Sequence, residues 1–314
     1  MKNIDNEDVP HKRLETKKSW FSNKFHSIRD YFASQLILDE LKVISPTLTN
    51  FDEELTLDFN QLTELEKQGK SISQVKVLTL QIEDNIIKAK LADIFPNIER
   101  LNITGNRVCL AKGSISKFAF LNYLNIDNQT TVISSGSVYD CPKLAVTRVK
   151  SKDFLIYGGY NFAICPSLKD ISIDVTRFIA RQKSFEFCSA HSFSVLAKKM
   201  TVGGDCFSHS RTSSIRLKSL TADIRNTFCF CTYLEELKIL SNNLKIDDDF
   251  MVFCPNLKTK DIQSSWDYYA EMTKRKSLSE KVLAEASNVF NEERIKNNLS
   301  RIEDRLPVEE MRIK

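Results

Sequence analysis

The feature that most constrains the fold of this chain is an apolar pattern that recurs about every 23 residues. Each copy starts at an anchor residue and continues with apolar residues three, six and eight positions later. A period of roughly 20 to 50 residues indicates stacked structural repeats, so we expect an elongated array of coils. The clearest copies start at Cys165 and Cys231, others start at Ile72, Phe95, Phe118, Cys141 and Cys254, and Leu55 with Leu57 resembles a degraded first copy.

The end of each copy predicts a short β-strand. In Leu-x-Ile and similar triplets, two apolar side chains lie on one face of the strand and the middle residue lies on the other. One coil cannot bury such a face alone, so neighbouring coils must stack and join their strands into a parallel sheet. Phenylalanines three residues before the anchor, which recur through the second half of the pattern, predict a further core position at Phe162, Phe185, Phe207 and Phe228.

Two copies near the middle of the chain fit the pattern poorly. Cys188 is followed by His191 and Ser194 where apolar residues are expected. The copy at Ser210 needs a shift of one residue to use Ile215. We expect the frame to bend here without being lost, because the anchor spacing stays close to the repeat length on both sides.

The pattern Phe-x-x-Cys-x-x-Leu-x-x-Ile-x-Ile resembles the BspA-like class of leucine-rich repeats. The stretch 202–207 is similar to the Ile-Gly-x-x-Ala-Phe segment of that family, and the likeness covers about 55–262. It implies a leucine-rich-repeat fold and a binding function, since family members are mostly described as surface or intracellular binding proteins. The chain lacks the proline that often follows the strand and has only 8 glycines, so we expect Asn, Asp and Ser to form turns, as at 104–106 and 247–249.

The predicted fold is an α/β or β-rich solenoid with a parallel sheet of about ten short strands and helical caps at both ends. Residues 1–48 would form an N-terminal tail and a capping helix, because Phe21, Phe25 and Phe32 belong to one apolar helical stripe. Residues 49–263 would form the repeats and 264–314 a charged helical cap. The N-terminal helix could instead recruit a partner. We expect no membrane contact, since acidic residues interrupt its basic side.

Composition excludes several functional classes. The 45 basic and 41 acidic residues nearly cancel, leaving a formal charge of +4, so nothing suggests nucleic acid. The chain lacks the run of roughly 18 apolar residues that a membrane helix needs, and its first thirty residues do not resemble a secretion signal. We therefore expect a cytoplasmic protein. The alternative is the cell surface, reached by unconventional export.

Eight cysteines and four histidines raise the question of disulfides, metal sites or catalysis. Five cysteines occupy the anchor position, where Phe and Ile also occur, so we expect buried thiols that act as small apolar side chains. A disulfide between stacked coils is geometrically conceivable. Cys229 and Cys231 are too close in sequence for the usual zinc spacing, and no motif orients a pair such as Cys206 and His209. We expect no metal, no cofactor and no enzymatic activity.

The residues beside the buried pair of each strand are the candidate binding residues. They combine both charges with an aromatic ring on a broad, rigid surface, which favours a protein partner over a small-molecule substrate. We expect an interaction scaffold that binds its partner on the concave strand face, and a cell-surface adhesion protein or an adaptor acting through its N-terminal helix are the alternatives. The candidate residues are Arg100, Asn102, Tyr123, Asn125, Arg148, Lys150, Asp170, Glu236 and Lys238.

Overall fold

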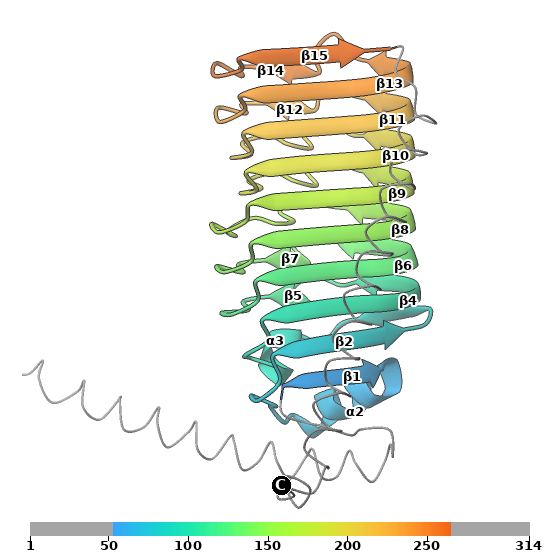
Figure 1. The fold of residues 1–314 in the computed structure, drawn as a ribbon, viewed down its shortest axis with the longest axis vertical. Coiled ribbons are helices and arrows are strands. Elements are labelled where there is room, and N and C mark those ends of the chain that lie inside the picture. The colour runs from blue at the N-terminus through green and yellow to red at the C-terminus, as the bar shows by residue number, and fades with distance from the viewer. Residues whose placement is uncertain (1–52, 265–314) are drawn as a thin grey trace, which may run out of the picture. The chain divides into compact units, whose positions relative to one another are not determined.

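The computed structural model describes residues 53–264, which form a stack of coils with one long parallel sheet along its side (Figure 1). The sheet has 11 strands, and β3 (Asn85–Ile87) pairs only with β4. Its other strands follow one another in chain order: β1 (Glu54–Asp58), β2 (Val77–Ile82), β4 (Arg100–Leu110), β6 (Tyr123–Ser134), β8 (Val146–Tyr157), β9 (Asp170–Ala180), β10 (Ser192–Val202), β11 (Ser214–Ile224), β13 (Glu236–Ile246) and β15 (Thr259–Gln263). The predicted parallel solenoid of about ten strands is therefore confirmed.

Short strands form the second side of the coils, behind the long sheet in Figure 1. Strand β5 (Ile115–Ser116) pairs with β7 (Val138–Tyr139), and β12 (Phe228–Cys229) pairs with β14 (Met251–Val252). Because both pairs are parallel and join neighbouring coils, backbone hydrogen bonds also connect these coils on the second side.

Two helices lie in the first coils. Helix α2 (Phe59–Gln68) begins directly after β1, and its capping box consists of mutual side-chain and backbone hydrogen bonds between Asp58 and Gln61. It ends at Gly69 in the left-handed conformation. Helix α3 (Leu91–Ile94) is a single turn. The predicted caps at 1–48 and 264–314 lie outside the described residues, apart from residue 264.

The core consists of repeat positions that face each other inside the coils. Leu124 and Ile126 are fully buried, whereas Asn125 between them faces outward, as the alternation predicts. The anchors Cys141, Cys165, Cys188 and Cys231 and the four predicted phenylalanines are also fully buried. Rings of neighbouring coils stack, with centroids 5.2 Å apart for Phe185 and Phe207. The core positions predicted for these coils are confirmed, whereas the anchor Cys254 of the last coil is only partly buried.

The irregular middle coils keep their register by a one-residue shift. Ala190 is buried in place of His191, and strand β10 buries Phe193 and Val195 one position before the expected positions 194 and 196. Phe193 and Val195 pair with Ile171 and Ile173 of β9, 22 residues earlier. The expected shift at Ser210 is also present, since Ile215 and Leu217 are buried.

Most strands of the long sheet are longer than predicted, at 11 or 12 residues. The interpretation of 104–106 as a turn was wrong, because these residues lie inside β4. Gly105 lies at a corner of this strand with a φ of +129°, and a Cβ atom there would lie 2.0 Å from the carbonyl oxygen of Ile82. Small or narrow residues occupy the same register position in later coils: Asn128, Ser151, Val175, Ala197, Ser219 and Ser241.

Candidate interaction surfaces

All nine candidate residues lie on the outward side of the long sheet, which we call the outer face. Strand register places them in columns, because equivalent residues of successive coils pair with each other. The first column contains Arg100, Tyr123, Asp170 and Glu236, the second contains Asn102, Asn125, Arg148 and Lys238, and Lys150 belongs to a third. The structure gathers seven of them on β4, β6, β8 and β9, whereas β10 and β11 separate the two residues of β13 from the rest.

Four of the seven gathered residues contact each other in pairs across strands, and Asn102 contacts β2. The Arg100 guanidinium lies over the Tyr123 ring, 5.6 Å from its centroid. Arg148 forms an ion pair with Asp170 on the next strand. The Asn102 side-chain amide donates a hydrogen bond to Thr79 at 3.3 Å. These contacts hold side chains of both charges in fixed positions on a rigid surface.

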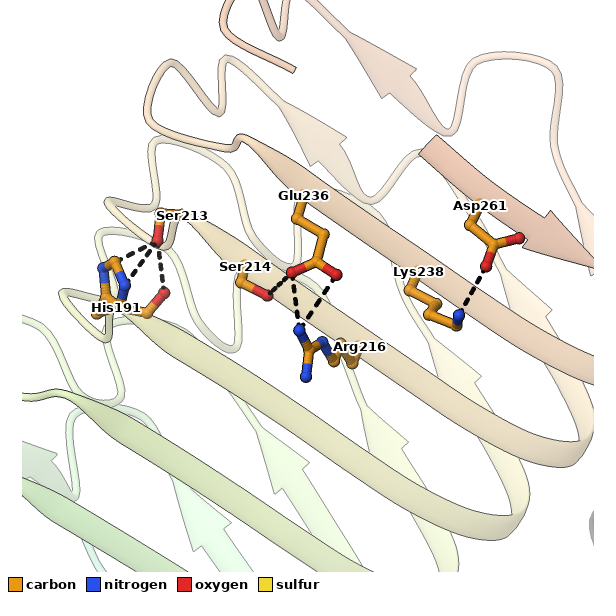
Figure 2. A network of polar contacts seen from close by, with 7 residues as sticks. All are labelled: His191, Ser213, Ser214, Arg216, Glu236, Lys238 and Asp261. Atoms are coloured by element: carbon orange, nitrogen blue, oxygen red, sulfur yellow. Dashed lines mark hydrogen bonds and ion pairs between the residues drawn. The ribbon is translucent and has the colours of Figure 1, made fainter. Parts of the chain in front are cut away.

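Figure 2 shows a second polar group on the outer face, over β11, β13 and β15. Glu236 accepts hydrogen bonds from Ser214 at 2.7 Å and from Arg216 at 3.0 Å. These two donors hold the pKa of Glu236 below its ordinary value. Lys238 forms an ion pair with Asp261 at 2.8 Å and, together with Gln263, lowers the pKa of that carboxyl.

The residue directly before each anchor forms a different surface, which the sequence analysis did not identify. In seven successive coils this residue has a positive φ, between +52° and +61°: Lys117, Asp140, Ile164, Phe187, His209, Phe230 and Phe253. Bulky residues rarely adopt this left-handed conformation, which costs about 1–2 kcal/mol per residue. The last four carry rings, so an energetically costly backbone position repeatedly presents an aromatic side chain.

These rings and Tyr160 form a stack that we call the aromatic row: Tyr160, Phe187, His209, Phe230 and Phe253. Consecutive ring centroids lie 6.1, 5.4, 5.3 and 5.9 Å apart, and the first three pairs are within 13° of parallel. The side chains remain solvent accessible, with Phe187 46% and Phe253 62% exposed. The row is therefore an exposed apolar patch that crosses several coils.

Hydrogen bonds between coils hold the backbone of the row in its unusual conformation. The amide of Phe187 donates to the carbonyl of Ser208, and the amide of Phe230 donates to that of Val252 at 2.8 Å. The amide of His209 donates to Cys229 in the same way. Phe230 and Phe253 directly follow β12 and β14, so the row lies along the second side of the coils.

A groove of about 540 Å³ adjoins the N-terminal end of the row. Tyr160, Ile164 and Phe187 form part of its apolar lining, and the lining also contains His209 and Arg211. Within residues 53–264, the groove is lined by no carboxylate and the Arg211 guanidinium has no ion-pair partner. The only lining side chain with a permanent charge in this part of the chain is thus an unpaired cation.

Within residues 53–264, the two pairs that resemble catalytic groups show no contact with a carboxylate that would activate them. Cys206 is fully buried, and its burial raises the pKa of the thiol, while His209 stacks between Phe187 and Phe230. Ser213 Oγ lies 2.9 Å from His191 Nδ1, as Figure 2 shows, but no carboxylate in the figure contacts this histidine. All eight cysteines are free thiols, and the described part of the chain contains no group of side chains that fits a metal ion.

Comparison with known proteins supports the repeat architecture. A model of the BspA type leucine-rich repeat region, with six copies, matches residues 85–211 and 156–279. No curated protein and no solved structure matches the chain. None of the helices in residues 53–264 is both long and apolar enough to span a membrane. The matched residues cover more than half of the sequence and include most of the long sheet, and the chain therefore belongs to the BspA-type leucine-rich repeat family.

Proposed function

We propose that this protein is a non-catalytic scaffold that binds a protein partner on its outer face. The observation that carries the proposal is the cluster of Arg100, Tyr123 and Arg148 on three adjacent strands. Arginine and tyrosine are the side chains that most often dominate the energy of protein interfaces. The repeat family supports a role in protein interaction, and the outer face offers a broad surface for it.

Contacts within the free protein favour binding at this cluster. The Arg100 side chain is already held over Tyr123, and Arg148 is held by Asp170. Side chains that are ordered before binding lose less conformational entropy in the complex. Asn125 and Lys150 belong to the neighbouring columns, so we include them with Asn102 in the proposed surface. Glu236 and Lys238 would contact only a partner long enough to cross β10 and β11.

The test is a cross-linked pull-down from native lysate followed by reconstitution with the purified partner. The full chain is compared with a variant that combines Arg100→Ala, Tyr123→Ala and Arg148→Gln. Arg225→Gln is the control, since Arg225 is an exposed arginine in the loop after β11. Circular dichroism first establishes that both variants fold.

We expect the combined variant to bind the purified partner at least about 10-fold more weakly, which corresponds to about 1.4 kcal/mol. The control variant should bind like the wild type. Equal affinity of all three proteins would contradict binding at the outer face and would move the function elsewhere on the chain, for example to the recruiting helix expected within residues 1–48.

A further inference from the structure

We propose that the aromatic row and its adjoining groove form a second binding site, separate from the outer face. Its ligand would be an extended polypeptide segment of a partner protein, in which a bulky apolar side chain stands next to an aspartate or glutamate. The apolar side chain would enter the groove beside Tyr160, Ile164 and Phe187. The carboxylate would pair with Arg211.

The fold does not require aromatic rings at these positions. Lys117 and Asp140 adopt the same left-handed conformation at the equivalent position of earlier coils, with φ values of +61° and +55°. The amide of Lys117 donates to the next coil at 3.2 Å, as the amide of Phe187 does. A polar side chain can therefore occupy this position without loss of the inter-coil contact. Burial does not explain the rings either, since Phe230 is 47% exposed.

Stacking between the rings offsets part of the free energy that their exposure to water costs. It still leaves an apolar surface open to water. An aromatic pair contributes about 0.5–1.5 kcal/mol beyond the burial of its area. The ring faces of Phe187 and His209 contact each other, so a ligand would meet mainly ring edges and the groove beside them. Exposed patches of this kind are typical of protein interaction sites.

The charge of the groove selects the chemistry of the ligand. Arg211 lies in the groove lining and has no ion-pair partner among the described residues, and His209 lies beside it. A guanidinium offers a fork of N–H donors that fits a carboxylate, and partial removal from water strengthens the pair. An apolar ligand without an acidic group would leave this cation desolvated and unpaired.

The length of the row fits an extended segment of several residues. The row crosses five coils, and parallel strands stack about 4.8 Å apart, so it extends for roughly 20 Å. An extended chain advances about 3.3 Å per residue, which makes the row as long as about six residues. The groove occupies only the end that contains Tyr160 and Phe187. A bound segment would thus continue along the row towards Phe253.

The experiment selects ligands from a library of random eight-residue peptides displayed on phage, using the purified full chain. Enriched peptides are synthesised with a fluorescent label, and their affinity is measured by fluorescence polarisation. We expect them to share a bulky apolar residue next to Asp or Glu. Failure to enrich any peptide, or enrichment of peptides without an acidic residue, would overturn the proposal.

Two substitutions test the site itself. Phe230→Lys introduces the residue that the chain already has at Lys117, so it should fold, and thermal unfolding will establish this. We expect it to weaken peptide binding at least about 5-fold, and Arg211→Ala to weaken it at least about 10-fold, or about 1.4 kcal/mol. Tyr123→Ala on the outer face is the control and should leave the peptide affinity unchanged. Wild-type affinity of the Phe230→Lys variant would exclude the row.

A double-mutant cycle tests the pairing of Arg211 with the ligand carboxylate. Replacing the acidic residue of the peptide by its amide should weaken binding to the wild type about 10-fold. The same replacement should change binding to the Arg211→Ala protein less than about 2-fold. Additive effects would show that the carboxylate binds elsewhere, and would overturn the assignment of Arg211. This outcome is independent of the outer-face test, because neither Arg211 nor Phe230 is substituted in that test.

Discussion

Gly105→Ala should destabilise the N-terminal coils more than alanine at any other glycine of the chain would destabilise its own coils. Gly105 combines a φ of +129° with close contact to the neighbouring strand. An added Cβ atom would lie 2.0 Å from the carbonyl oxygen of Ile82 and 2.7 Å from its carbonyl carbon. Because both atoms belong to the backbone, no side-chain rotation can relieve the overlap. Strands β2 and β4 would have to separate at this corner.

The expected loss of stability has two parts. A non-glycine residue held in such a backbone conformation costs about 1–3 kcal/mol. Separating the strands weakens one or two backbone hydrogen bonds, at about 1 kcal/mol each. We therefore expect the free energy of unfolding to fall by about 2–5 kcal/mol.

Gly204→Ala is the matched control. An added Cβ atom at Gly204 meets no atom within 4 Å, and its φ lies outside the positive range. Alanine there should be neutral or should stabilise the fold by up to about 1 kcal/mol, because it restricts the unfolded chain. Urea unfolding followed by circular dichroism measures both variants. A Gly105→Ala protein within about 0.5 kcal/mol of the wild type would refute the reasoning from this close contact.

Three further predictions concern the core, the outer face and the cysteines. Phe185→Ala should lower the free energy of unfolding by about 3–5 kcal/mol in urea, because the ring is fully buried and contacts several other rings. Asp170→Asn should lower the free energy of unfolding by less than about 1 kcal/mol, since the ion pair with Arg148 is solvent accessible. A larger loss would contradict the small contribution expected of this pair. Iodoacetamide should modify Cys254 well before Cys188, as mass spectrometry can show, because Cys254 is partly exposed and Cys188 is buried. The rate at Cys254 should also begin to rise at a lower pH than the rate at Cys188, since the neighbouring Cys231 lowers the pKa of Cys254, whereas burial raises the pKa of Cys188 to about 11.

The sequence predicts the solenoid well because its core must repeat. Each coil buries the same positions against its neighbours, so Leu124 and Leu237 stand in equivalent surroundings and the period is visible in the chain itself. The corner inside each long strand was harder to find. Its marker is a small or narrow inward residue such as Gly105, Asn128 or Ser151, and such residues are common in turns as well.

The two surfaces differ in how far the sequence could predict them. Strand alternation places the outer-face residues directly, since each stands next to a buried position. The aromatic row depends on a left-handed backbone conformation that side-chain type does not reveal, and bulky residues such as Phe187 and Phe230 normally disfavour it. A recurring ring directly before the anchor, at Phe187, Phe230 and Phe253, was nevertheless present in the sequence.

Both proposed sites consist of residues that recur from coil to coil. The outer-face residues stand on the long strands, whereas the row residues precede the anchors on the second side of the coils. Because they occupy different positions of one repeat, a partner on one surface leaves the other accessible. A core substitution such as Phe185→Ala should weaken neighbouring coils and both sites, whereas Tyr123→Ala and Phe230→Lys should separate them. Two partners held on one rigid solenoid is the arrangement expected of a scaffold.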